Sequence, residues 1–134
     1  MIKYYYYRAE IIRRNGEKME NKRIYMYGMI LVTNSFLLKN ELPQADEYAE
    51  IQKKYFLTGG ETGTASIVLA SLGCQLILDG THQGTISYPV VKKCFDNIKV
   101  DTSLLTFDET YEGCQDYVFI DKKSRTIFGS FGEF

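Results

Sequence analysis

The segment of this sequence best suited to hold a ligand is Thr58-Gly59-Gly60-Glu61. Two adjacent glycines let the backbone approach a ligand closely and adopt conformations that other residues avoid. A helix predicted to begin at Glu61 would point its first backbone N–H groups at the same loop, where hydroxyls, phosphates or carboxylates can bind. A purely structural interpretation competes, because Thr58-x-x-Glu61 also matches a capping box. From these residues alone, we favour the structural interpretation.

The elements around this loop predict an α/β fold. Ile24–Val32 is a nearly continuous apolar run, typical of a central strand covered on both faces, and Thr33-Asn34-Ser35 should end it. The alternating segment Ile51–Leu57 predicts a strand of a smaller sheet or flap. After the loop, Glu61–Leu72 predicts a helix that Gly73 stops. The apolar residues of this helix share one face: Ala65, Val68, Leu69 and Leu72.

The second half of the sequence continues the alternation of strands and helices. Gln75–Leu78 predicts a short buried strand, and Ile86–Phe95 predicts a second helix in which Pro89 must fall in the first turn. A hairpin turn joins two closing strands, Asp116–Asp121 and Arg125–Ser130. This order of elements implies an α/β domain with right-handed crossovers.

Composition and charge limit the classes of function. A length of 134 residues fits one domain, and a net charge of -1 gives no basic field for nucleic acid or anionic lipid. No apolar run approaches the ~20 residues that span a bilayer, and the start lacks a signal peptide, so we expect a cytoplasmic protein. Cys74, Cys94 and Cys114 lack the close pairing of a zinc site, so we expect buried or half-buried thiols and no metal.

Residues 1–22 differ in character from the rest of the chain. The four tyrosines Tyr4–Tyr7 precede a basic stretch and a polar break, and a clear strand pattern begins only at Arg23. One hypothesis takes Met19 as the natural start. The alternative is a genuine extension whose tyrosines pair with a sheet edge. We therefore treat 1–22 as an extension and 23–134 as the folded unit.

The motifs of the folded unit occur in a recognisable order. Along the chain they are Tyr27-Gly28, Thr33, Gly59-Gly60, a helix ending in Leu72-Gly73, Leu78-Asp79-Gly80, Val100-Asp101-Thr102-Ser103, Gly113 and Arg125-Thr126. In this order and spacing, the sequence from about Lys22 onward resembles the ribokinase-like (PfkB) carbohydrate kinases. The helix after Gly59-Gly60 looks like the first signature of that family.

The resemblance implies a doubly wound sheet with a small β lid, and transfer of a phosphoryl group from ATP, with Mg²⁺, to a sugar or nucleoside hydroxyl. In such enzymes the Gly-Gly loop and the lid hold the acceptor, while an anion hole and a catalytic aspartate lie in the carboxy-terminal half. No Asp-x-x-Gly-Ala-Gly-Asp-like segment occurs here. We therefore expect a truncated, amino-terminal part of the fold without catalytic residues. Family lids commonly mediate dimers, which suggests a homodimer through the lid or an exposed sheet edge.

Two positions depart from the family pattern, and both concern the acceptor. The family usually has an aspartate five residues after the first-strand glycine and an asparagine four residues after the second glycine of the pair. These positions are Thr33 and Thr64 here. A threonine hydroxyl cannot make a charged or bidentate contact, and Asn34 could take over part of the task. The predicted acceptor-binding residues are accordingly Thr33, Asn34, Gly59, Gly60 and Thr64.

A different class of function stays open from the sequence: a non-catalytic α/β module that binds a ligand or another protein. His82, in a loop between strand and helix, lies where α/β folds often place ligand contacts. A lone histidine is nonetheless better explained as a satisfied loop residue. Tyr111, Tyr117 and Phe119 are likewise better explained as core residues than as a cover for a sugar ring.

Overall fold

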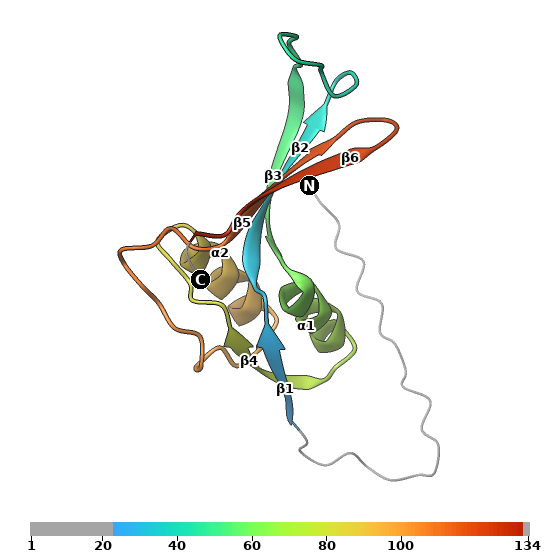
Figure 1. Cartoon of the computed structure of the whole chain (residues 1–134). Coiled ribbons are helices and arrows are strands. Elements are labelled where there is room, and N and C mark those ends of the chain that lie inside the picture. Colours follow the sequence, from blue (N-terminus) through green and yellow to red (C-terminus); the bar gives the residue numbers. More distant parts are fainter. Residues whose placement is uncertain (1–22, 133–134) are drawn as a thin grey trace.

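The computed structural model describes residues 23–132. In chain order the elements are β1 (Arg23–Gly28), β2 (Leu31–Leu38), β3 (Ile51–Gly59), α1 (Glu61–Ser71), β4 (Gln75–Gly80), α2 (Ser87–Asn97), β5 (Gln115–Ile120) and β6 (Arg125–Ser130). The strands form two sheets, a parallel pair β1-β4 and a four-stranded sheet in the order β3-β2-β5-β6 (Figure 1). The interpretations of residues 1–22, including a start at Met19, lie outside the described residues.

The base of the molecule consists of β1, β4 and the two helices, and it contains the hydrophobic core (Figure 1). The buried core residues are Ile30, Val32, Leu76, Leu78, Val91, Phe95 and Val100. The outer edge of β4 is covered by Asp101, whose N–H donates to the Leu76 carbonyl at 3.1 Å and whose carbonyl accepts from the Leu78 N–H at 2.9 Å. Strand β4, helix α2 and the segment that follows α2 therefore form one packed unit.

The four-stranded sheet extends away from this base as a lid (Figure 1). Strand β2 runs antiparallel to β3 and parallel to β5, and β6 returns antiparallel to β5. On one face the ring of Phe36 stacks on Phe119 with centroids 5.1 Å apart, and Phe119 meets Phe128 edge-on at 5.9 Å. These aromatic contacts hold three strands together where the sheet has left the core.

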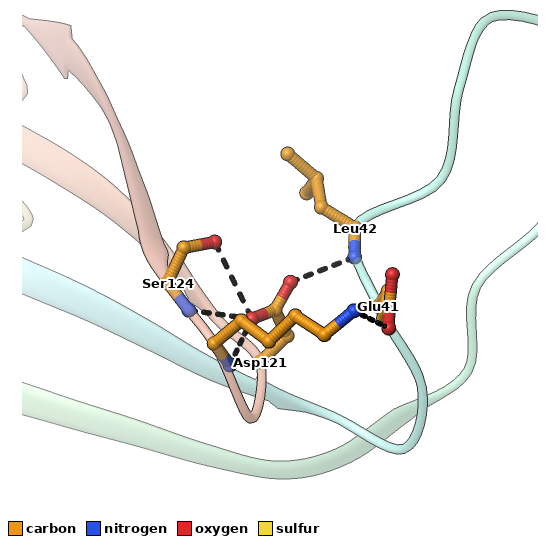
Figure 2. A network of polar contacts seen from close by, with 5 residues as sticks. Glu41, Leu42, Asp121 and Ser124 are labelled. Carbon is orange, nitrogen blue, oxygen red and sulfur yellow. Dashed lines mark hydrogen bonds and ion pairs between the residues drawn. The ribbon is translucent and has the colours of Figure 1, made fainter.

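The tip of the lid is fastened by the carboxylate of Asp121 (Figure 2). It accepts hydrogen bonds from the N–H groups of Lys123 and Ser124, both at 2.7 Å, and of Leu42 at 3.0 Å. Hydrogen bonds from these three backbone groups lower the pKa of Asp121 to about 2. An ion pair of 2.5 Å between Lys123 and Glu41 joins the same two segments. The carboxylate thus ties the β5–β6 turn to the loop that follows β2.

The predicted strand Ile24–Val32 is wrong in two respects. The chain leaves the first sheet at Gly28 and enters the second at Leu31, and β2 then continues through Thr33-Asn34-Ser35 instead of ending there. The break has a tertiary cause, because the Ile30 N–H donates to the Thr81 hydroxyl at 3.1 Å instead of to a neighbouring strand. Nor is β1 covered on both faces, since its alternate residues are exposed, among them Tyr25 and Tyr27 at 55% and 71%.

Both predicted helices, the strand predicted at Ile51–Leu57 (β3) and the closing hairpin are confirmed. Pro89 lies in the first turn of α2, as predicted. The predicted apolar face of α1 is wrong, because Val68 and Leu72 are 54% and 37% exposed. The buried residues of α1 are instead Thr62, Gly63 and Ser66. Small residues on this face let the helix lie close to the β1–β2 connection, since even a Cβ at Gly63 would contact Ile30.

The cysteines lie in the environments that the sequence predicts, with Cys114 buried and Cys74 and Cys94 half-buried as free thiols. Within residues 23–132 no group of three His, Cys, Asp or Glu side chains could hold a metal ion. In the same range no helix is both long and apolar enough to cross a membrane.

Candidate functional site

The Gly59-Gly60 turn joins the lid strand β3 to helix α1, and its geometry requires glycine. Gly60 has φ 82° and ψ 159°, a combination open almost only to glycine. A Cβ at Gly60 would collide with the carbonyl oxygen of Met29, and a Cβ at Gly59 would collide with the hydroxyl of Thr33. The turn is therefore packed directly against the β1–β2 connection, and it brings the lid against the base of the molecule.

The first N–H groups of α1 are already used inside the protein, which corrects the expectation that they are free for a ligand. The N–H groups of Thr62 and Gly63 both donate to the Met29 carbonyl, at 3.1 and 3.3 Å. The Thr64 N–H donates to the Gly60 carbonyl at 2.9 Å. Because a backbone oxygen occupies the positive end of the helix, the turn does not offer the amide cradle that phosphate binding needs.

The capping box predicted from Thr58 and Glu61 does not form. Gly60 is the N-cap residue of α1, and no side chain caps the helix. The Met29 carbonyl takes over that function by accepting from the first turn. Among the described residues the Thr58 hydroxyl is buried without a hydrogen-bond partner.

Thr33 lies on the face of β2 that meets the Gly-Gly turn, and a carboxylate lies beside it. The cross-strand partners of Thr33 are Leu57 in β3 and Asp116 in β5. Burial raises the pKa of Asp116, and a hydrogen bond with Thr33 only partly offsets this. One oxygen of the carboxylate, Oδ1, is buried without a hydrogen-bond partner in the described part of the chain. Sequence reasoning missed Asp116, although a single acidic residue within an apolar strand was a signal for it.

The remaining predicted side chains lie apart from this face. Asn34 follows Thr33 in β2 and therefore points to the opposite side of the sheet. There it is buried, and its Nδ2 donates to Gln115 Oε1 at 3.3 Å and to the Asp116 carbonyl at 3.1 Å. Thr64 is exposed in the first turn of α1. The structure thus joins Thr33 to the Gly-Gly turn, whereas Asn34 cross-links β2 and β5 on the other face.

A cavity of about 360 Å³ opens where the parallel strands β1 and β4 end. It is lined by Tyr27, Gly28, Met29, Gly80, Thr81, His82, Tyr111 and Cys114. None of the five predicted acceptor-binding residues lines it. The cavity therefore lies at the strand ends where α/β proteins often bind ligands, next to the Gly-Gly turn through the shared residue Met29.

Several polar groups around this cavity are engaged in hydrogen bonds with neighbouring parts of the protein. Thr81 donates its hydroxyl proton to the Ile30 carbonyl at 2.6 Å, and His82 Nδ1 lies 2.5 Å from the Thr106 hydroxyl. The Tyr111 hydroxyl donates to the Phe131 carbonyl at 2.6 Å, and burial raises the pKa of this tyrosine. These bonds hold the loops together, and His82 is an exposed, hydrogen-bonded loop residue, as the sequence predicts.

A parallel α/β base, a Gly-Gly turn into α1 and a projecting β lid define the ribokinase-like fold, and this confirms the predicted fold class. Similar solved structures include ribokinases and nucleoside kinases. The nucleoside kinase of Methanocaldococcus jannaschii, described as an archaeal member of the ribokinase family, has a TM-score of 0.70 and 20% identity over 86% of this chain and 38% of its own. Arabidopsis thaliana ribokinase, complexed with ribose and ATP, has a TM-score of 0.69 and 13% identity over 81% of this chain and 35% of its own.

A third similar structure is the nucleoside kinase of Burkholderia thailandensis in complex with inosine. Its TM-score is 0.68 at 12% identity, over 81% of this chain and 36% of its own. The chain thus spans little more than a third of the length of these kinases. At such identities the likeness shows the fold alone. No protein-family model matches the sequence, and no curated protein matches it.

Proposed function

We propose that residues 23–134 form the acceptor-binding and lid part of an ATP-dependent carbohydrate or nucleoside kinase. The observation that carries this proposal is the Gly59-Gly60 turn, which leaves no room for side chains and packs against Thr33 within a ribokinase-like fold. Kinases of the same fold have been solved with ribose and with inosine. The acceptor class that we propose is therefore a sugar or a nucleoside, phosphorylated on a hydroxyl group.

The polar groups near the turn suit a neutral polyhydroxyl ligand better than an anion. The Met29 carbonyl takes up the N–H groups that an anion would need. The hydroxyls of Thr33 and Thr64 can each donate and accept a hydrogen bond, as sugar hydroxyls require. In this proposal Gly59 and Gly60 let the turn pack against Thr33 and Met29, so that the turn and the Thr33 hydroxyl lie beside the ligand. Asn34 supports the site from the opposite face of β2.

ATP and Mg²⁺ belong to the proposed kinase but find no fitting site among the described residues. The amides of α1 are occupied, and within residues 23–132 no cluster of three potential ligands could hold a metal ion. We derive no phosphoryl-transfer step from this chain's residues. The proposal assigns ATP, Mg²⁺ and the catalytic groups to the carboxy-terminal half that the resemblance implies, and this chain spans 38% and 35% of the length of two similar kinases.

The lid is also the surface through which we propose that two copies associate. Apolar side chains are exposed on both of its faces, with Phe56 and Phe128 at 61% and 55% on one and Leu57 and Ile127 at 51% and 52% on the other. Exposed apolar surface of this kind favours association. Sedimentation velocity of the wild type and of Phe56→Ser/Phe128→Ser tests this: a dimer that the variant loses supports it, and a wild-type monomer at all concentrations contradicts it.

Calorimetric titration with pentoses, hexoses and nucleosides, in the absence of ATP, tests the proposed function. We expect saturable binding of at least one of these ligands, weakened several-fold by Thr33→Val because a hydroxyl contact is lost. Thr126→Val is the matched control, since Thr126 is a half-buried strand residue in β6, away from the Gly-Gly turn. A folded chain that binds none of these ligands would refute the proposal.

A further inference from the structure

A carboxylate on β5 lies beside the position where the ribokinase-like kinases, which this sequence resembles, usually have an aspartate five residues after the first-strand glycine. That position is Thr33 in this chain, and its cross-strand partner in β5 is Asp116. Paired residues on neighbouring strands lie about 5 Å apart and share one face of the sheet. A carboxylate at either position can therefore reach much the same volume next to the Gly-Gly turn.

The environment of the Asp116 carboxylate is energetically unfavourable, which calls for an explanation. Its Oδ1 is buried without a hydrogen-bond partner, and no ion pair in the described residues includes it. Leaving a buried acceptor unpaired costs stability, and it costs more when the group is charged. The raised pKa is the consequence of this burial. Val118, two residues later on the same face of β5, is apolar and buried.

The surroundings of the carboxylate suit a sugar ring. The next residue across the sheet is Gly129 in β6, and the ring of Phe131 occupies the space that a side chain at Gly129 would need. An aromatic ring thus lies near an unpaired hydrogen-bond acceptor on one face of the lid. Sugar and nucleoside rings present apolar C–H faces together with hydroxyl donors, so this pairing of groups matches their chemistry.

We propose that Asp116 is the carboxylate that binds the acceptor in this chain, with Oδ1 accepting a hydrogen bond from a hydroxyl of the sugar or nucleoside. Thr33 holds the carboxylate in place from β2. In this proposal the carboxylate is supplied by β5, from the cross-strand partner of Thr33. This inference rests on the proposed function and adds the residue that recognises the hydroxyl.

The test compares ligand binding with stability in a set of variants. Asp116→Asn keeps the shape of the side chain and removes its charge. It should lower the affinity for the ligand that the wild type binds by about tenfold or more, because charge-assisted hydrogen bonds are roughly twice as strong as neutral ones. The double variant Thr33→Asp/Asp116→Thr returns the carboxylate to β2 and should restore most of the binding. Asp96→Asn, at an exposed ion pair with Lys92, is the matched control.

Stability separates a binding role from a structural one. Because burial disfavours the charged form, Asp116→Asn should keep or raise the urea midpoint while binding is lost. If Asp116→Asn lowers binding and stability together, or binds like the wild type, the inference is overturned and the proposed function stands. If the wild type binds no sugar or nucleoside, the proposed function fails, and the inference fails with it.

Discussion

Replacing Gly60 with alanine perturbs the turn on which the site depends. Alanine at φ 82° and ψ 159° carries backbone strain of about 1–3 kcal/mol. Its Cβ would also collide with the Met29 carbonyl, which accepts N–H groups from Thr62 and Gly63. Losing those two bonds, at about 0.5–1.5 kcal/mol each, brings the expected loss in the free energy of unfolding to about 2–6 kcal/mol.

Gly73→Ala provides a matched control for this prediction. Gly73 has a similar φ of 86°, but a Cβ there would meet no atom within 4 Å. Only the left-handed backbone is penalised, by about 1–2 kcal/mol. Urea unfolding followed by circular dichroism and tyrosine fluorescence measures both variants. Equal losses in the free energy of unfolding for Gly60→Ala and Gly73→Ala would show that the collision with Met29 costs no stability, and would refute the reasoning.

Three further predictions concern the lid, the core and α1. Asp121→Asn should remove an acid sensitivity: the pKa is lowered from 3.8 to about 2, so the stabilisation is present above pH 3.8 and is lost as the pH falls through about 2. Acid titrations followed by circular dichroism should therefore show that the wild type loses its folded-state signal more steeply below pH 3.8 than Asp121→Asn does. Parallel curves for the two proteins would contradict this. Phe95→Ala should lower the free energy of unfolding by about 3–5 kcal/mol in urea, since Phe95 is fully buried in the core, and a loss below about 1 kcal/mol would contradict the packing. Val68→Ser should change the free energy of unfolding by less than about 0.5 kcal/mol, apart from the difference in helix propensity between the two residues, because Val68 faces outward. A loss as large as that for a core residue would support the apolar face of α1 predicted from the sequence.

The fold could be predicted because its signals are local. Glycine pairs, the Gly73 helix stop and a hairpin turn each fix the backbone within a few residues, and their order defines the architecture. The break between β1 and β2 could not be predicted in the same way. The apolar run continues through it, and the chain is bent by contacts of Ile30 and Gly28 with residues far along the sequence. The buried face of α1 is a similar case, because threonine, serine and glycine give no apolar pattern.

Only part of the candidate site could be predicted from the sequence, for the same reason. Thr33, Gly59 and Gly60 are predicted as acceptor-binding residues from their spacing within motifs, and this stays a prediction. The proposed role of Asp116 depends on the parallel pairing of β2 with β5, whose register joins residues about eighty positions apart. Asn34 was placed by its neighbourhood in the sequence, but strand geometry turns it to the other face.

Mapping backbone amide shifts by NMR during titration with ribose and with inosine, without ATP, tests the central claim most directly. If this chain holds the acceptor, saturable shifts should centre on Thr33, the Gly59-Gly60 turn and Asp116, with those of the lid tip near Asp121 unchanged. Absence of any shift in the folded chain would contradict the claim, and so would shifts confined to the cavity around His82.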